Sequence, residues 1–197
     1  GATHQILEDI GMMKMLPGMT VINPCDYNQT KLATIALGDH IGPAYLRFGR
    51  PKWPIFTPEN AKFQIGKGIK FLDGNDISIF ATGHMLWQAL EAEKILFSLG
   101  ISCEVINIHT IKPLDEEIIL ESIKKTKCAI SCEEHNIIGG LGESISRLIS
   151  EKHPIPFKVI GVNDSFGESG KPLDLLEKYN LNPESIKEAA LEVIDKK

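Results

Sequence analysis

Several features that would place a protein in a special class are missing from these 197 residues. No apolar run approaches the roughly 20 residues needed to cross a bilayer, and the first residues lack the charged and apolar segments of a signal peptide. No low-complexity tract or repeat is present. The net charge is -5 and Lys and Arg do not cluster, which argues against nucleic acid as the principal partner because backbone phosphates require grouped cations. We therefore predict a globular, cytoplasmic protein; the start without Met indicates a fragment or a processed chain.

Cysteine is scarce, and its spacing excludes two kinds of site. No CxxC pair occurs, so neither a zinc site nor a redox dithiol is indicated. Cys128 and Cys132 lie on one side of a predicted strand with Ile130 between them, as a buried face requires. All four cysteines are predicted to be reduced core residues: Cys25, Cys103, Cys128 and Cys132.

Dinucleotide and P-loop signatures are also missing. Gly139-Gly140-Leu141-Gly142 follows a predicted strand and precedes a helix, so its free amides could hold a phosphate. Its spacing is not G-x-G-x-x-G, however, and it carries no P-loop lysine. A structural tight turn is the favoured interpretation.

What the chain does contain is a regular alternation of strands and helices. Asp26, Asp115 and Asn182 are typical N-caps, and Gly100 is a typical helix C-cap. Alternation of this kind predicts a mainly parallel sheet covered on both faces. The predicted strands are residues 19–22, 44–48, 77–81, 103–108, 128–132 and 157–160, and the first predicted helix covers residues 4–16.

Three prolines interrupt this pattern and mark a linker. Residues 1–50 form one unit, residues 51–74 are predicted to be the linker, and residues 75–197 are predicted to form a three-layer α/β/α domain. The fold class is therefore α/β, with a mostly parallel sheet in the C-terminal domain.

Other polar residues could carry chemistry, but each has a simpler interpretation. Glu133-Glu134-His135 could be an acid/base cluster or a metal site, although a surface or interface cluster is favoured because no further ligand stands at a defined spacing. His84 and His109 each follow a strand, and capping or hydrogen-bonded structural roles are favoured for both. The loop of residues 164–170 lacks a nucleophile-elbow pattern and is predicted to be a packed connector.

Two residues are stronger candidates for a site. His4 stands beside a hydroxyl and an amide at a helix start, a polar group suited to a small oxygen-rich substrate, and the alternative is a solvated terminal residue. Arg47 emerges from an apolar strand and offers the planar donors that bind phosphate, and its alternative is a surface salt bridge.

Taken together, these motifs resemble the transketolase family of thiamine-diphosphate enzymes over nearly the whole chain. The earlier motifs look like the later half of its pyrimidine-binding domain, and the remaining ones look like its C-terminal domain. They are, in order, Gly1-Ala2-Thr3-His4-Gln5, Glu8-Asp9-Ile10, Pro17-Gly18-Met19-Thr20-Val21, Pro24-Cys25-Asp26, Gly42-Pro43-Ala44-Tyr45-Leu46-Arg47, Ala81-Thr82-Gly83, Thr110-Ile111-Lys112-Pro113-Leu114-Asp115, Glu133-Glu134-His135 with Gly139-Gly140-Leu141-Gly142, and Phe166-Gly167-Glu168-Ser169-Gly170.

The resemblance implies roles for both candidates. His4 matches a histidine that contacts the sugar near its reacting carbonyl, and Arg47 matches the arginine that binds the sugar phosphate. The implied activity is transfer of a two-carbon ketol unit from a ketose phosphate to an aldose phosphate. The C-terminal domain, from about Asn75, is expected to serve assembly and not catalysis.

The resemblance also implies missing parts. In the family a separate N-terminal domain holds the diphosphate and its Mg2+, and a glutamate upstream of Gly1 protonates the cofactor. No cofactor or metal is expected on this chain alone. Its expected partners are an N-terminal transketolase subunit or domain and a second copy that forms a dimer through the C-terminal domain.

Ala2 replaces a proline often found before Thr3, which looks like the split transketolases. Alternatives within the superfamily are 1-deoxyxylulose-5-phosphate synthase and the beta subunit of a 2-oxoacid dehydrogenase. A non-catalytic interaction module is the alternative from another class. The stretch from Phe166 to Gly170, followed by Leu175-Leu176, looks more like transketolase.

Overall fold

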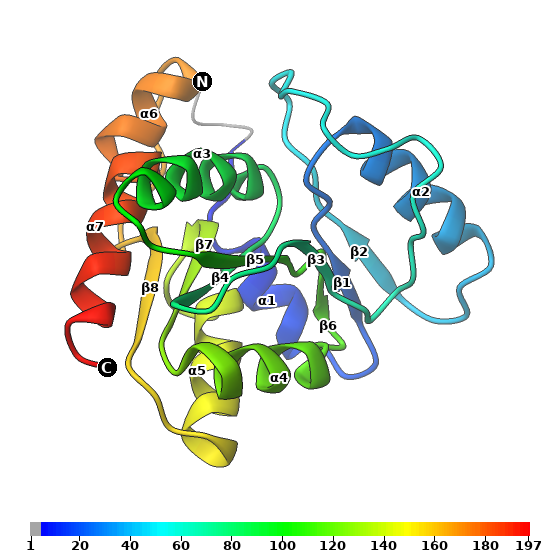
Figure 1. Ribbon diagram of the computed structural model, residues 1–197. Coiled ribbons are helices and arrows are strands. Elements are labelled where there is room, and N and C mark those ends of the chain that lie inside the picture. The colour runs from blue at the N-terminus through cyan, green and yellow to red at the C-terminus, as the bar shows by residue number, and fades with distance from the viewer. Residues whose placement is uncertain (1–4) are drawn as a thin grey trace.

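The computed structural model describes residues 5–197, and its first part is a small α/β unit (Figure 1). This part contains α1 (Asp9–Met15), β1 (Thr20–Ile22), α2 (Tyr27–Gly38) and β2 (Ala44–Leu46). The first helix is shorter than the predicted residues 4–16. β1 and β2 pair in parallel, and the antiparallel β6 (Thr110–Lys112) completes their three-stranded sheet. A strand from the later part of the sequence therefore joins the first unit.

The second part is built on a five-stranded sheet in the order β3-β5-β4-β7-β8. Its strands are β3 (Ile69–Leu72), β4 (Ile77–Ala81), β5 (Cys103–Asn107), β7 (Ala129–Asn136) and β8 (Phe157–Val162). All neighbours are parallel except β3 and β5. The predicted mostly parallel sheet is confirmed, and the predicted linker contributes β3 as its antiparallel edge.

Helices cover both faces of this sheet, which gives the predicted three layers (Figure 1). One face packs against α3 (Met85–Ser98) and α7 (Pro183–Ile194), and the other packs against α4 (Glu116–Thr126) and α5 (Leu141–Lys152). α6 (Pro172–Lys178) leads into α7. The two buried cores contain Ile79, Leu86 and Ala190 on one side and Phe80, Ile119 and Ile145 on the other. None of the helices in the described part of the chain is both long and apolar enough to span a bilayer.

The predicted helix caps are present. Asp26 accepts from the Gln29 amide at 2.9 Å, and Asn182 accepts from the Ser185 amide at 2.8 Å. Asp115 caps α4 in the same way. Asp26 also accepts from the Thr57 amide at 2.7 Å. One carboxylate thus caps α2 and fastens the irregular segment after β2 to the first unit.

Candidate functional site

Arg47 lies immediately after β2 and is held by two contacts, one from the first residue of α1 and one from the chain before it. Its Nε donates to Asp9 Oδ2 at 3.0 Å, and its Nη2 donates to the Ile6 carbonyl at 3.4 Å. The Tyr45 hydroxyl donates to the same Asp9 oxygen at 2.8 Å. Burial, together with this bond to Asp9, raises the pKa of Tyr45 to about 12. The Asp9 side chain is only 3% exposed, so it needs both donors to compensate the loss of hydration.

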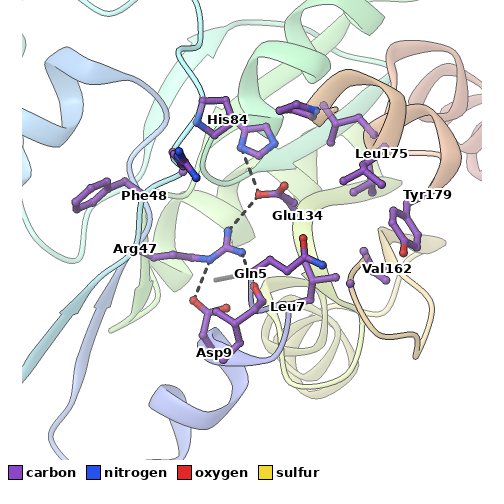
Figure 2. A pocket seen from close by; sticks show the side chains of 18 of the residues that line it. Gln5, Leu7, Asp9, Arg47, Phe48, His84, Glu134, Val162, Leu175 and Tyr179 are labelled. Carbon is purple, nitrogen blue, oxygen red and sulfur yellow. Dashed lines mark hydrogen bonds and ion pairs between the residues drawn. The ribbon is translucent and has the colours of Figure 1, made fainter. Parts of the chain in front are cut away.

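The free side of Arg47 faces a cavity of about 440 Å³ (Figure 2). Its Nη1 lies 3.7 Å from Glu134 Oε2, which is beyond hydrogen-bonding distance. The far wall is mostly apolar and includes Val162, Leu175 and Tyr179. The cavity therefore has a charged end and an apolar end, and Arg47 belongs to the charged end.

His84 brings the start of α3 into the cavity wall. Its ring stacks on Trp53 with centroids 4.3 Å apart, and its Nδ1 lies 3.6 Å from Glu134 Oε2. Burial lowers the pKa of His84, which favours a neutral imidazole. Its Nε2 is buried without a hydrogen-bond partner among residues 5–197. The prediction of a capping or hydrogen-bonded structural histidine is wrong for His84, because its side chain makes no cap hydrogen bond and lies 3.6 Å from Glu134.

The other candidate, His4, lies outside the described residues. Gln5, the next residue, lines the cavity. The connector formed by residues 164–170 also reaches it, because Gly167 and Gly170 are part of the wall. An added Cβ at Gly167 would lie 2.8 Å from Gln5 Nε2. The prediction of a packed connector is wrong for most of this stretch, because Phe166 is 91% exposed and only Gly167 and Glu168 are partly buried, but the connector does shape the cavity.

The glycine turn before α5 is a structural turn whose anion site is filled by the protein itself. Glu133 accepts from the amides of Leu141 at 2.7 Å and Gly142 at 2.8 Å. Lys14 Nζ donates to the carbonyls of Gly139 and Gly140 at 2.7 and 2.6 Å. Burial raises the pKa of Glu133 to about 7, although the two amides and Lys14 oppose this shift. These amides are therefore not free to hold a phosphate.

The expected surface cluster at residues 133–135 is wrong for two of its three members. Glu133 and His135 are fully buried. His135 Nε2 accepts from the Gly11 amide at 3.3 Å, and burial lowers its pKa. Only Glu134 reaches the cavity, because side chains alternate between the two faces of a strand.

His109 is a buried structural residue, as predicted. Its Nδ1 lies 3.0 Å from Thr110 Oγ1, and its ring stacks on Phe63 with centroids 4.3 Å apart. Burial lowers its pKa to about 4. The prediction for the cysteines is also confirmed, since Cys25, Cys103, Cys128 and Cys132 are buried and free.

The described residues do not fit a diphosphate and metal site. Within residues 5–197, no group of three or more His, Cys, Asp or Glu side chains could hold a metal ion. The helix start best placed for a diphosphate is occupied by Glu133.

The sequence did not predict that three residues would meet Arg47 at one cavity: Asp9, His84 and Glu134. Asp9 is 38 residues from Arg47 in the sequence, and no local pattern links the two. His84 and Glu134 could have been paired, because they follow or end neighbouring parallel strands, β4 and β7, whose carboxyl ends meet at one sheet edge.

Comparison with known proteins places this arrangement in a family. The sequence model described as the transketolase C-terminal domain matches residues 66–186, and that of the transketolase pyrimidine-binding domain matches residues 1–54. A 6-deoxy-6-sulfo-D-fructose transketolase subunit from Clostridium sp. strain MSTE9 is 40% identical over 100% of this chain and 61% of its own. A 1-deoxy-D-xylulose-5-phosphate synthase from Caldanaerobacter subterraneus is 33% identical over 98% of this chain and 31% of its own.

Among solved structures, a split-gene transketolase in the form of an inactive β4 tetramer superimposes with a TM-score of 0.95. It is 39% identical, and the match covers 99% of this chain and 64% of that one. The chain thus spans less than two thirds of the length of each of these proteins. Because the C-terminal domain model alone covers more than half of its residues, the chain belongs to the transketolase family of thiamine-diphosphate-dependent enzymes.

Proposed function

We propose that this chain is the C-terminal part of a split transketolase that transfers a two-carbon ketol unit from a ketose phosphate to an aldose phosphate. The observation that carries the proposal is the match of the whole chain to a transketolase subunit and to a split-gene transketolase. The first is named as a subunit, and the second is named as a split-gene product.

Arg47 is proposed to anchor the substrate phosphate. Its guanidinium is oriented by Asp9 and Ile6, and its Nη1 is directed into the cavity. A planar cation held in this way can bind a phosphate oxygen without first reorganising. An anchor remote from the reacting carbon keeps the sugar in a productive pose. His4 is proposed to contact the sugar near its reacting carbonyl, where an imidazole can donate or accept a hydrogen bond.

The carbanion chemistry belongs to thiamine diphosphate, which with Mg2+ is proposed to be held mainly by an N-terminal partner subunit. We further propose that the assembled enzyme contains two copies of each chain and that this chain is inactive alone. The inactive β4 state of the split-gene neighbour supports this proposal. Free, buried cysteines support a cytoplasmic location.

The domain division proposed here is a partial pyrimidine-binding domain in residues 1–50, a linker in residues 51–74 and a C-terminal domain in residues 75–197. The extents of the two matching family models support it. Removing residues 75–197 should therefore destroy the cavity, because His84 and Glu134 belong to that part of the chain.

A second candidate activity is that of 1-deoxyxylulose-5-phosphate synthase, which is favoured by the relative that is 33% identical. The name of that relative also contains a sugar phosphate, so the Arg47 anchor does not separate the two activities. The product separates them, because only the proposed transketolase transfers a ketol unit between two sugars.

The proposal is tested by reconstitution. The chain, extended upstream and mixed with its N-terminal partner, thiamine diphosphate and Mg2+, is expected to transfer a ketol unit from a ketose phosphate to an aldose phosphate. The chain alone serves as the control and is expected to be inactive. Condensation of pyruvate with glyceraldehyde 3-phosphate, without ketol transfer, would establish the synthase instead. Acetyl transfer from pyruvate to a lipoyl acceptor would establish the 2-oxoacid dehydrogenase subunit, and no activity with any donor would favour an interaction module.

A further inference from the structure

Two of the three guanidinium nitrogen atoms of Arg47 are hydrogen-bonded within the protein, and the third faces the cavity. Nε and Nη2 bond to Asp9 and to the Ile6 carbonyl. Nη1 makes no hydrogen bond to any residue from 5 to 197, and its nearest charged neighbour is Glu134 at 3.7 Å. Any anion that binds Nη1 must therefore bind beside the Glu134 carboxylate.

Within residues 5–197, the one Lys or Arg that pairs with Glu134 is Arg47, at 3.7 Å, and Asp9 lies closer to Arg47, at 3.0 Å. The second neighbour of Glu134 is His84 Nδ1 at 3.6 Å, and burial keeps that imidazole neutral by lowering its pKa. The Glu134 side chain is 34% exposed and lines the cavity. Arg47 is already balanced by Asp9, which bonds to it directly. The charge of Glu134 consequently faces the space that a bound anion would occupy.

Arg47 and Arg50 contribute two positive charges to the cavity wall, while Asp9, Glu134 and Glu168 contribute three negative charges, and Glu168 is paired with Lys178. A dianion placed here brings twice the repulsion with Glu134 that a monoanion brings, because Coulomb energy is proportional to each charge. The geometry of the guanidinium suits both, since phosphate and sulfonate groups each present oxygen atoms to a planar donor.

We propose that Glu134 is a specificity-determining residue that disfavours a dianionic end group on the sugar relative to a monoanionic one. The inference rests on the proposed function and concerns the charge of the group bound at Arg47: Glu134 weakens binding of a dianionic phosphate more than that of a monoanion such as a sulfonate. A sulfonated sugar appears in the name of the 40% identical relative.

The test compares Glu134→Gln with the wild type in the assembled enzyme at pH 8, where a phosphate monoester is a dianion because its second pKa is about 6. Two isosteric donors are used, fructose 6-phosphate and 6-deoxy-6-sulfofructose. Removing one charge at roughly 7 Å in water is worth about threefold for a monoanion and about sevenfold for a dianion. We therefore expect Glu134→Gln to lower KM about threefold for the sulfonate and about sevenfold for the phosphate.

Glu151→Gln is the matched control. Glu151 lies in α5, is half exposed and pairs with Arg147, so this variant loses the same charge without changing the cavity. The ratio of the two KM values is expected to stay at its wild-type value. Calorimetric titration of both sugars into the assembled protein provides a Kd ratio that does not depend on turnover.

Two results would overturn the inference. If the phosphate-to-sulfonate ratio of KM and that of Kd were both unchanged in Glu134→Gln, the carboxylate would not act on the anion. Equal increases for both sugars would show that Glu134 only holds Arg47 in place. A wild-type enzyme that transfers no ketol unit would instead remove the proposed function, and the Kd ratio would still decide the role of Glu134.

Discussion

Glu133 and Glu134 are neighbours in β7, yet one closes an anion site and the other borders an open one. At the start of α5, the Glu133 carboxylate accepts from two helix amides and leaves no room for another anion. At the end of β2, Asp9 takes only Nε of Arg47, so Nη1 still faces a cavity. Both regions had the residue types expected of a phosphate site. A phosphate site is therefore available only where the protein's own carboxylates leave hydrogen-bond donors unused.

The largest expected effect comes from opening the closed site. An added Cβ at Gly140 would overlap the Glu133 carboxylate, so Gly140→Ala must displace a buried charge from both amides. We expect a loss of about 4 kcal/mol in the free energy of unfolding. Urea denaturation of the chain measures it.

Gly38→Ala is the matched control, because no atom lies within 4 Å of the added Cβ. It is expected to remain within about 1 kcal/mol of the wild type. A Gly140→Ala protein as stable as Gly38→Ala would show that the Glu133 contacts do not stabilise the fold.

The second largest effect is expected from breaking the ion pair between Arg47 and Asp9. Arg47→Met leaves the Asp9 carboxylate, which is 3% exposed, with Tyr45 as its remaining side-chain donor. Breaking a buried pair by removing one partner should cost about 3 kcal/mol. Adding Asp9→Asn should restore most of this loss, because the uncompensated charge is gone.

Denaturation of the wild type, both single variants and the double variant completes the thermodynamic cycle. Additive losses in the double variant would contradict a direct coupling between Asp9 and Arg47.

A smaller effect should appear in the pH dependence of stability. The pKa of Glu133 in the folded state is about 7, above the ordinary value of 4.5 for an unfolded Glu. The folded state therefore binds a proton more tightly, so stability falls as pH rises from 4.5 through 7 and then levels off. For Glu133 this loss should be about 2–3 kcal/mol.

The measurement is the unfolding free energy at pH 4.5 to 8 for the wild type, Glu133→Gln and Glu134→Gln. Glu133→Gln should lack this part of the decline, and Glu134→Gln should retain it. Identical profiles for the wild type and Glu133→Gln would refute the assignment.

Much of the fold could be predicted from local sequence signals. Asp26 and Asn182 cap the helices expected of them, because capping depends on a few neighbouring residues. The alternation of strands and helices predicted the parallel sheet. The antiparallel joining of β6 to β1 could not be predicted in the same way, since it links Val21 to Lys112 across 91 positions (112 minus 21).

The candidate site was less predictable than the fold. Arg47 was identified by its place after an apolar strand, whereas Asp9 and Glu134 acquire their meaning only from contacts with it. Glu133 and Glu134 look alike in the sequence, and the alternation of side chains along β7 separates them. Which of the two faces the cavity depends on the packing of α1 and α5 around that strand.

The measurement that tests the account most directly is the substrate selectivity of Arg47→Met in the assembled enzyme. The kcat/KM for ketol transfer is compared for a ketose phosphate and for the same ketose without phosphate. Loss of a hydrogen bond between charged groups predicts a decrease of about 10-fold to 100-fold for the phosphorylated donor and little change for the other. Equal losses for the two donors would contradict the role of Arg47 as the phosphate anchor.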